Sequence, residues 1–161
     1  MSAPAPSSAI CVSNRQRLQR LNSAAVLQLA HFILDHLQLT AELGIQFVGP
    51  KRMAQLNWQY LQHEGSTDVI TFDHGSSPKH LHGDIAICVA DAVSQAAEFH
   101  TTWPEEVTRY VIHGILHLLG YDDLTPAKRR AMKQVENRLL KLAKRKGWHH
   151  VGRAAGSVGS D

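Results

Sequence analysis

Apolar positions along this chain change their period several times, and each change marks an expected element. From residue 23 to residue 37 they recur every three or four positions, which predicts an amphipathic helix capped by Asn22 or Ser23. Residues 42–48 alternate between apolar and other side chains, which predicts a strand that Gly49 and Pro50 end. Further strands are expected at residues 10–13, 68–72 and 83–87, and further helices at 53–60, 89–99, 103–119 and from 125 onward.

This alternation of strands and helices, without an internal repeat, predicts an α+β fold with a single domain. We expect a mixed β-sheet layered with helices. Residues 1–9 contain only Ala, Pro and Ser after Met1 and are expected to be a disordered leader, with the folded domain at residues 10–146. Residues 147–161 are rich in Gly and Ala and are expected to form a flexible tail.

Composition indicates the type of protein and its expected cellular location. The chain has 161 residues, of which 43% are hydrophobic, and this suits one globular domain. Its two cysteines, Cys11 and Cys88, lie among apolar residues and are expected to be reduced core residues, which favours a cytoplasmic protein. The longest apolar run, residues 85–90, is too short to span a bilayer, so no membrane partner is expected.

Positive charge is concentrated near the C-terminus. Nine of the 17 Lys and Arg residues lie between residues 128 and 146, where Glu136 is the only acid. A basic helix face of this kind predicts contacts with the RNA backbone, and the residues assigned to that role are Lys133, Lys141 and Lys144. A solvated helix face and a membrane-surface helix are the alternative interpretations.

A candidate metal site lies in the helix expected at residues 103–119. His113 and His117 are four residues apart, so both imidazoles lie on one helix face. Gly120 ends the helix, and Asp123 follows where the returning chain can reach the same ion. Two imidazoles, one carboxylate and an open position for water form the ligand arrangement of catalytic zinc sites. The alternative is that both histidines are ordinary buried side chains.

The spacing of these ligands equals that of zincin-like metalloproteases, in which a glutamate follows the first histidine. That position is Gly114 here, and a glycine cannot act as the general base. Peptide hydrolysis is therefore disfavoured. Metal-dependent hydrolysis of another substrate remains open.

Several blocks of the chain resemble the YbeY family of bacterial endoribonucleases. The segment from residue 113 to residue 123, HGILHLLGYDD, is similar to the family signature H-G-x-L-H-L-x-G-Y-D-H and departs from it only at the last position. Residues 56–60, 67–72 and 82–88 are similar to three further family blocks and occur in the same order. The resemblance runs from about residue 10 to residue 146.

This resemblance implies a zinc-dependent endoribonuclease that cleaves single-stranded RNA, with one zinc ion per chain. The implied role is maturation of the 3′ end of 16S rRNA and ribosome quality control, with the small ribosomal subunit as partner. Two departures matter: Asp123 replaces the usual third histidine, and Leu61 replaces an arginine implicated in catalysis or RNA contact. The loss of that arginine leaves open a non-catalytic, metal-containing protein that binds RNA or ribosomes.

A third departure suggests a catalytic candidate. Arg109 lies one turn before His113, where the family commonly has histidine. We hypothesise that its guanidinium stabilises the transition-state charge in place of the arginine missing at position 61. The alternative is a surface ion pair between Arg109 and Glu105. Either water or the RNA 2′-hydroxyl can be the attacking group, and the products, a 5′-phosphate or a cyclic phosphate, would distinguish them.

Overall fold

The computed structural model describes residues 7–61, 68–147 and 150–152, except for the side chain of Leu61. Within this part, a mixed sheet packs against helices in one domain, which confirms the predicted α+β class. The strands are β1 (Ala9–Asn14), β2 (Thr40–Val48), β3 (Val69–Asp73) and β4 (His80–Cys88). The helices are α1 (Ser23–His36), α2 (Pro50–Leu56), the π-helix η1 (Asn57–Leu61), α3 (Val89–Phe99), α4 (Trp103–Leu119) and α5 (Pro126–Arg145).

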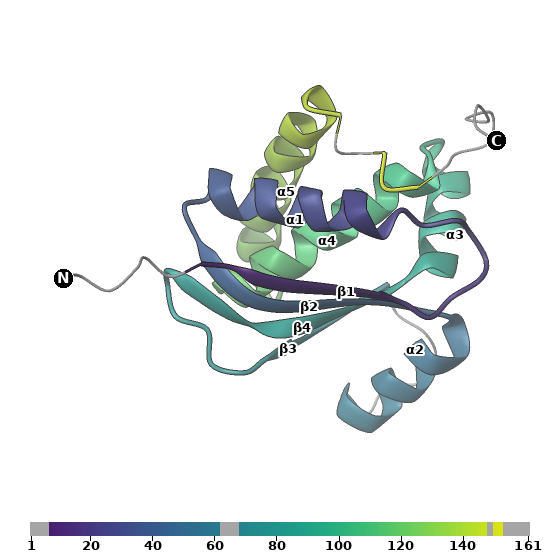
Figure 1. Cartoon of the computed structure of the whole chain (residues 1–161), viewed down its shortest axis with the longest axis horizontal. Coiled ribbons are helices and arrows are strands. Elements are labelled where there is room, and N and C mark those ends of the chain that lie inside the picture. The colour runs from purple at the N-terminus through teal and green to yellow at the C-terminus, as the bar shows by residue number, and fades with distance from the viewer. Residues whose placement is uncertain (1–6, 62–67, 148–149, 153–161) are drawn as a thin grey trace.

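The sheet has the strand order β1-β2-β4-β3. β1 and β4 both run parallel to β2, whereas β3 is antiparallel to β4 and forms one edge. Helices α1, α3, α4 and α5 lie on one side of the sheet, and α2 lies on the other (Figure 1). The main hydrophobic core fills the first side, and a smaller cluster joins α2 to the far ends of β2 and β4.

Helix α4 is the central helix of the main layer and is buried on nearly every side. Its start is fixed by the Thr102 hydroxyl, which accepts a hydrogen bond from the Glu105 backbone N–H, and by Pro104 in the first turn. Its end is fixed by Gly120, whose φ of 115° is a left-handed conformation that favours glycine. The predicted limits of this helix, residues 103–119, are therefore confirmed.

The structure corrects several boundaries, among them the start of β2, which lies at Thr40 rather than at residue 42. Strand β1 begins at Ala9, inside the expected leader; residues 1–6 lie outside the described residues. Strand β4 begins at His80 rather than at residue 83, because its first residues pair with the start of β2. The helix expected at residues 53–60 is α2 followed by η1, so its hydrogen bonding changes at Asn57.

The expected tail also contains ordered residues. Val151 is fully buried, its carbonyl accepts a hydrogen bond from the Asn22 N–H, and Gly152 bridges to Leu21. The tail prediction is therefore wrong for residues 150–152, because an apolar side chain so close to the C-terminus still reaches the core. Residues 148–149 and 153–161 lie outside the described residues.

Two further findings concern the cysteines and the length of the apolar helices. Cys88 is buried as expected, whereas the prediction that Cys11 is a core residue is wrong, because Cys11 is exposed on β1, which is an edge strand of the sheet. Over the residues that were placed, we find no helix with the length and apolar character needed to cross a bilayer.

Candidate metal centre

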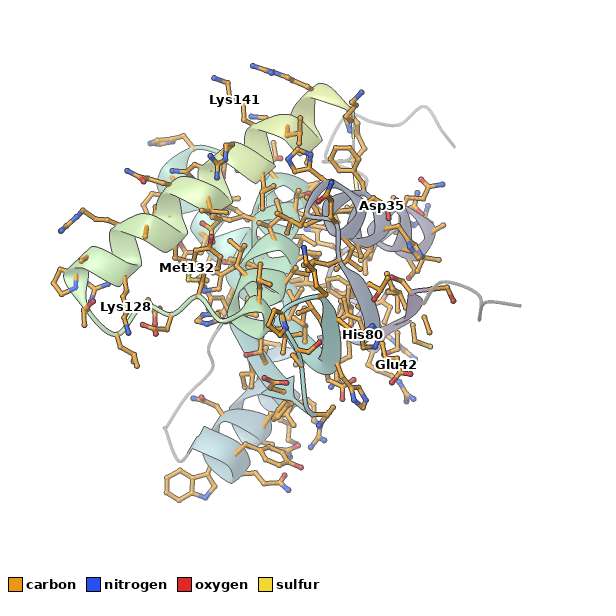
Figure 2. All side chains as sticks on the ribbon, turned by 90° about the vertical axis from the view of Figure 1, so that its left-hand side faces the viewer. Asp35, Glu42, His80, Lys128, Met132 and Lys141 are labelled. Carbon is orange, nitrogen blue, oxygen red and sulfur yellow. The ribbon has the colours of Figure 1, made fainter. Side chains whose placement is uncertain are left out.

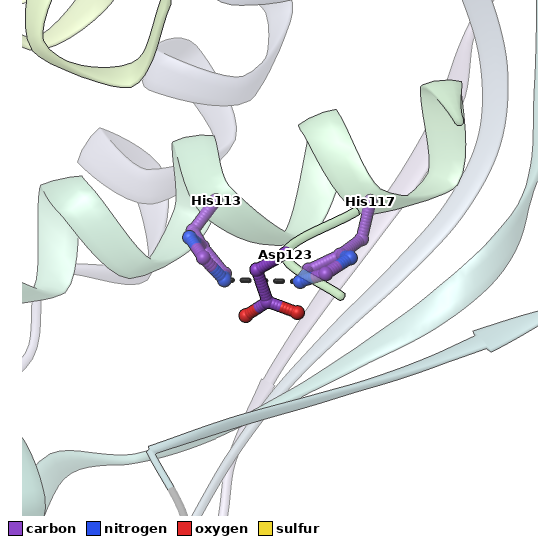
Figure 3. A group of neighbouring side chains, drawn as sticks. All are labelled: His113, His117 and Asp123. Carbon is purple, nitrogen blue, oxygen red and sulfur yellow. Dashed lines mark hydrogen bonds between the residues drawn. The ribbon is translucent and has the colours of Figure 1, made fainter. Parts of the chain in front are cut away.

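The two histidines of α4 face each other. The Nε2 atoms of His113 and His117 lie 3.0 Å apart, and their ring centroids are separated by 4.6 Å. After Gly120, the Tyr121 N–H bonds back to the Leu116 carbonyl, and the chain returns toward the histidines. The carboxylate of Asp123 then lies beside both rings (Figure 3). The structure thus brings the three predicted ligands together, with their ligand atoms all within 4.8 Å of one another.

This donor set fits zinc. Two nitrogens bound to one tetrahedral zinc ion at 2.0–2.1 Å are about 3.3 Å apart, close to the observed separation of the imidazole nitrogens. Two imidazoles and one carboxylate also leave a fourth position for water or substrate. Among the described residues, no other group of three such side chains meets these distances.

Asp122 is the alternative carboxylate next to Asp123, and it has other partners. It accepts a hydrogen bond from the Leu124 N–H at 3.0 Å and lies 3.4 Å from the Lys128 Nζ. The hydrogen bond from Leu124 and the charge of Lys128 lower the pKa of Asp122. Asp122 therefore stabilises the turn before α5, and Asp123 alone reaches the histidines.

Each candidate histidine ligand is held by a second group. The Nδ1 atom of His113 lies 2.6 Å from Oε1 of Glu136 in α5, and the His117 ring hydrogen-bonds the backbone of Tyr121. The contact with Glu136 places the proton of His113 on Nδ1, so the Nε2 lone pair of His113 is available to a metal. Burial, and then the charge of His113, lower the pKa of His117 and so favour the neutral imidazole that binds metals.

Glu136 is a candidate functional residue that the sequence interpretation missed. Its side chain is only 3% exposed, and it contacts Arg109 at 3.1 Å and Lys133 at 3.3 Å in addition to His113. Burial by itself would raise the pKa of Glu136, but its hydrogen bond to His113 and the nearby cations lower it overall. The sequence does contain a sign of its role. Glu136 is the single acid of the basic helix, and it lies four residues after Met132 and three before Leu139, on the face that is buried.

Arg109 lies in the wall between the metal centre and α5, but its partners differ from the expected ones. The guanidinium contacts Glu136, the Asn137 side chain at 2.9 Å and, more distantly, Glu106 at 3.7 Å. The alternative pairing with Glu105 is wrong, because Glu105 pairs with Lys144 at 2.7 Å. Arg109 remains a catalytic candidate, now with a defined place beside the ligand His113.

The predicted RNA contacts occupy different parts of α5. Lys133 lies next to Glu136, near the metal centre, whereas Lys144 is paired with Glu105. Lys141 is exposed, and Figure 2 shows it toward the opposite end of α5 from Lys128. Only Lys133 of the three therefore lies close to the candidate ligands.

Gly114, which takes the place of the protease glutamate, faces the sheet. A Cβ atom at this position would lie 2.7 Å from Cγ2 of Ile85, a fully buried residue of β4. The helix can approach β4 this closely only because residue 114 has no side chain. A glutamate here would be forced into the core, so the fold itself argues against the metalloprotease interpretation.

A pocket of about 720 Å³ opens beside the candidate ligands. Its walls come from α3, α4, α5 and the segments before β3 and after α4. Its lining includes His113 and Asp123, the basic residues Arg109, Arg129, Arg130 and Lys133, and the apolar residues Phe99, Tyr110 and Met132. Candidate metal ligands, positive charge and apolar surface therefore meet in one cavity.

Comparison with known proteins identifies the family of this chain. The family model described as Endoribonuclease YbeY matches residues 11–144. Endoribonuclease YbeY of Parabacteroides distasonis is 40% identical over 103 residues, which cover 64% of this chain and 72% of that protein. The relative of the same name in Frankia casuarinae is 33% identical over 146 residues, covering 82% of this chain and 73% of its own length.

The fold has a solved counterpart in the solution structure of TM1509 from Thermotoga maritima. The two superpose with a TM-score of 0.66 at 22% identity, over 92% of this chain and 98% of that one. This coverage shows that the likeness in fold extends over the whole domain. This chain belongs to the YbeY endoribonuclease family.

Proposed function

We propose that this protein is a zinc-dependent endoribonuclease that cleaves single-stranded RNA, with one zinc ion held by His113, His117 and Asp123. The observation that carries the proposal is the meeting of the ligand atoms of these three residues within 4.8 Å, where two of them, His113 and Asp123, line a cation-rich pocket. Membership of the YbeY family, whose relatives are named endoribonucleases, supports RNA as the substrate.

The residues of the pocket have separate tasks in this proposal. A bound zinc ion would supply Lewis acidity and an activated water. His113 and His117 hold it through neutral imidazoles, and Glu136 fixes the orientation of His113 through the 2.6 Å contact to Nδ1. Asp123 adds a negative charge that a third histidine would not, which makes the ion a weaker Lewis acid than in relatives with three histidines.

Positive charge around the pocket favours a polyanion. Arg109, Arg129, Arg130 and Lys133 line the cavity together with the candidate ligands His113 and Asp123. Cations placed beside a hydrolytic centre attract the phosphates on either side of the bond to be cleaved. Lys141 and Lys144, farther along α5, would contact the strand beyond the pocket. This arrangement suits an RNA strand better than a peptide.

We further propose that the natural substrate is rRNA and that the protein acts in the cytoplasm on the 3′ end of 16S rRNA, with the small ribosomal subunit as partner. This part of the proposal comes from the family signature at residues 113–122. The departure at Leu61 favours one competing function, a metal-containing RNA-binding protein without cleavage activity, and Arg109 is the residue we propose to compensate for it.

A substrate comparison tests the proposal. Zinc-loaded protein is incubated with a labelled single-stranded RNA, the same RNA in a duplex, and an unfolded protein substrate. We expect internal cleavage of the single strand, little cleavage of the duplex and no proteolysis. Binding of the single strand without cleavage would favour the non-catalytic function, and proteolysis would contradict the assignment made from Gly114.

A further inference from the structure

Phe99 is an exposed aromatic residue in the wall of the metal pocket. Its side chain is 59% exposed at the end of α3, although aromatic side chains usually gain stability by burial. The large exposed hydrophobic residues of the described chain are Leu18, Trp58, Tyr60, Phe99 and Leu124. Of these, only Phe99 lines the cavity that contains His113 and Asp123. The exposed side chain of Phe99 therefore lies where a substrate would bind.

The backbone that carries Phe99 is fixed. His100 ends α3 in a left-handed conformation, with φ of 57°, and the Thr101 N–H then bonds to the Ala96 carbonyl at 3.0 Å. The Thr101 hydroxyl donates to Glu106 of α4 at 2.8 Å. Phe99 therefore has a defined place relative to α4, and little ordering would be needed when a ligand binds.

A continuous series of polar contacts joins this corner of the pocket to the metal centre. Glu106 lies 3.7 Å from Arg109, Arg109 lies 3.1 Å from Glu136, and Glu136 lies 2.6 Å from His113. Along α4, Glu106 and His113 are about 10 Å apart. A ligand at Phe99 and a phosphate at the metal centre would thus occupy the two ends of one rigidly connected cavity.

The lining indicates the chemistry of that ligand. The ring of Tyr110 and the side chain of Met132 add apolar surface, while Arg129, Arg130 and Lys133 supply positive charge. The Tyr110 hydroxyl is buried and has no hydrogen-bond partner in the described part of the chain, and a buried polar group of this kind needs a water, an ion or a ligand to satisfy it. A flat aromatic group attached to a phosphate matches both the apolar and the cationic parts of the wall.

We propose that Phe99 stacks on an unpaired nucleobase of the RNA strand, next to the linkage cleaved at the metal centre. This inference rests on the proposed function and adds a base subsite to it. Stacking requires a base whose face is free, and in a duplex both faces of each base are covered by its neighbours. The Phe99 subsite therefore gives a physical reason for a preference for single-stranded RNA.

A binding comparison separates base stacking from phosphate contacts. The ligands are a fluorescent 2′-O-methyl oligonucleotide and an abasic oligonucleotide with the same number of phosphates, each titrated by anisotropy into the zinc-loaded protein. The variants are Phe99→Ala, Phe99→Trp and, as a control of similar exposure outside the pocket, Leu18→Ala. Thermal unfolding of each variant checks that the fold is retained.

For the oligonucleotide with bases, we expect Phe99→Ala to weaken binding about 5- to 150-fold, the range for one lost base–aromatic stack. Phe99→Trp and Leu18→Ala should bind like the wild type. For the abasic oligonucleotide, Phe99→Ala should bind as well as the wild type. Equal losses on both ligands, or no loss on either, would overturn the base subsite while leaving the nuclease proposal intact. Failure of the wild type to bind either oligonucleotide would overturn the proposed function and this subsite with it.

Discussion

Oε1 of Glu136 accepts a hydrogen bond from Nδ1 of His113 at 2.6 Å, and the carboxylate is only 3% exposed. The two residues belong to different helices, α4 and α5, and lie 23 positions apart in the sequence. A buried carboxylate placed behind a metal-binding imidazole fixes both its orientation and its tautomer. Through this contact, the packing of α5 on α4 sets the geometry of the candidate metal centre.

Replacement of this carboxylate should weaken zinc binding. Glu136→Gln keeps the shape of the side chain but lowers its negative charge and its strength as an acceptor, and we expect a loss of zinc affinity of about 10- to 100-fold. Glu105→Gln is the matched control, because Glu105 pairs with Lys144 away from the ligands. Chelator competition measures the affinity. Equal affinities for the two variants would show that Glu136 has only a packing role.

The two neighbouring aspartates should differ in the same assay. Asp123→Asn should reduce zinc affinity more strongly than Glu136→Gln, because it alters a ligand. Asp122→Asn should leave affinity unchanged, because Asp122 contacts Leu124 and Lys128 instead. If the Asp122 variant were the one that lost zinc, the assignment of the third ligand would be wrong.

Close packing at Gly114 gives a stability prediction. Gly114→Ala places a methyl group against Ile85, and we expect unfolding in urea to show a loss of about 1–3 kcal/mol. Gly114→Glu, which introduces the protease base, should prevent folding rather than create a protease. In an Ile85→Ala background the alanine at position 114 should cost less, because that change removes Cγ1, Cγ2 and Cδ1 of Ile85, the atoms that the added methyl group would meet. An unchanged cost in that background would show that the contact with Ile85 is not its source.

Arg109 supports two buried carboxylates, Glu106 and Glu136, which are 4% and 3% exposed. Arg109→Ala leaves both without this counter-charge, so we expect a loss of stability of about 3 kcal/mol in urea unfolding. Reduced cleavage by this variant would therefore not by itself identify Arg109 as a catalytic residue, because the loss of stability would also reduce cleavage. Arg109→Lys, which retains the charge, separates the roles: a folded lysine variant with normal zinc affinity and a reduced kcat would support the catalytic hypothesis, whereas unchanged kcat would contradict it.

Salt dependence tests the RNA contacts on α5. Each phosphate contact to a single strand contributes about 0.7 to the slope of log affinity against log salt concentration. Lys133→Ala should reduce the slope by about that amount, because Lys133 lines the pocket and its partner Glu136 is already paired with Arg109. Lys144→Ala should reduce it less, since Glu105 already neutralises Lys144 at 2.7 Å. A larger effect at Lys144 would place the RNA path away from the pocket.

The sequence predicted the features whose cause is local. Helix α4 could be delimited because a proline in its first turn and a glycine after its last turn determine where it begins and ends. The spacing of His113 and His117 placed both rings on one face because residues four apart in a helix are neighbours, which is also a local property. Features that depend on distant partners were missed, including the contact of Glu136 with His113 and the early start of β4, which pairing with β2 determines.

The C-terminal residues illustrate the same limit. A segment rich in Gly and Ala predicts a tail, yet Val151 enters the core and Gly152 meets Leu21, more than 100 residues earlier in the sequence. Composition describes what a segment can do by itself. The cavity left for one apolar side chain is a property of the folded domain, and no local pattern reports it.

The most direct test of the nuclease assignment is cleavage of a labelled single-stranded RNA by wild type and His117→Ala, each stripped of metal and then supplied with zinc. The ligand set of His113, His117 and Asp123 predicts that only the zinc-supplied wild type cleaves the strand internally and that stripping abolishes this activity. Cleavage by the stripped wild type, or equal cleavage by zinc-supplied His117→Ala, would show that the chemistry does not take place at this centre.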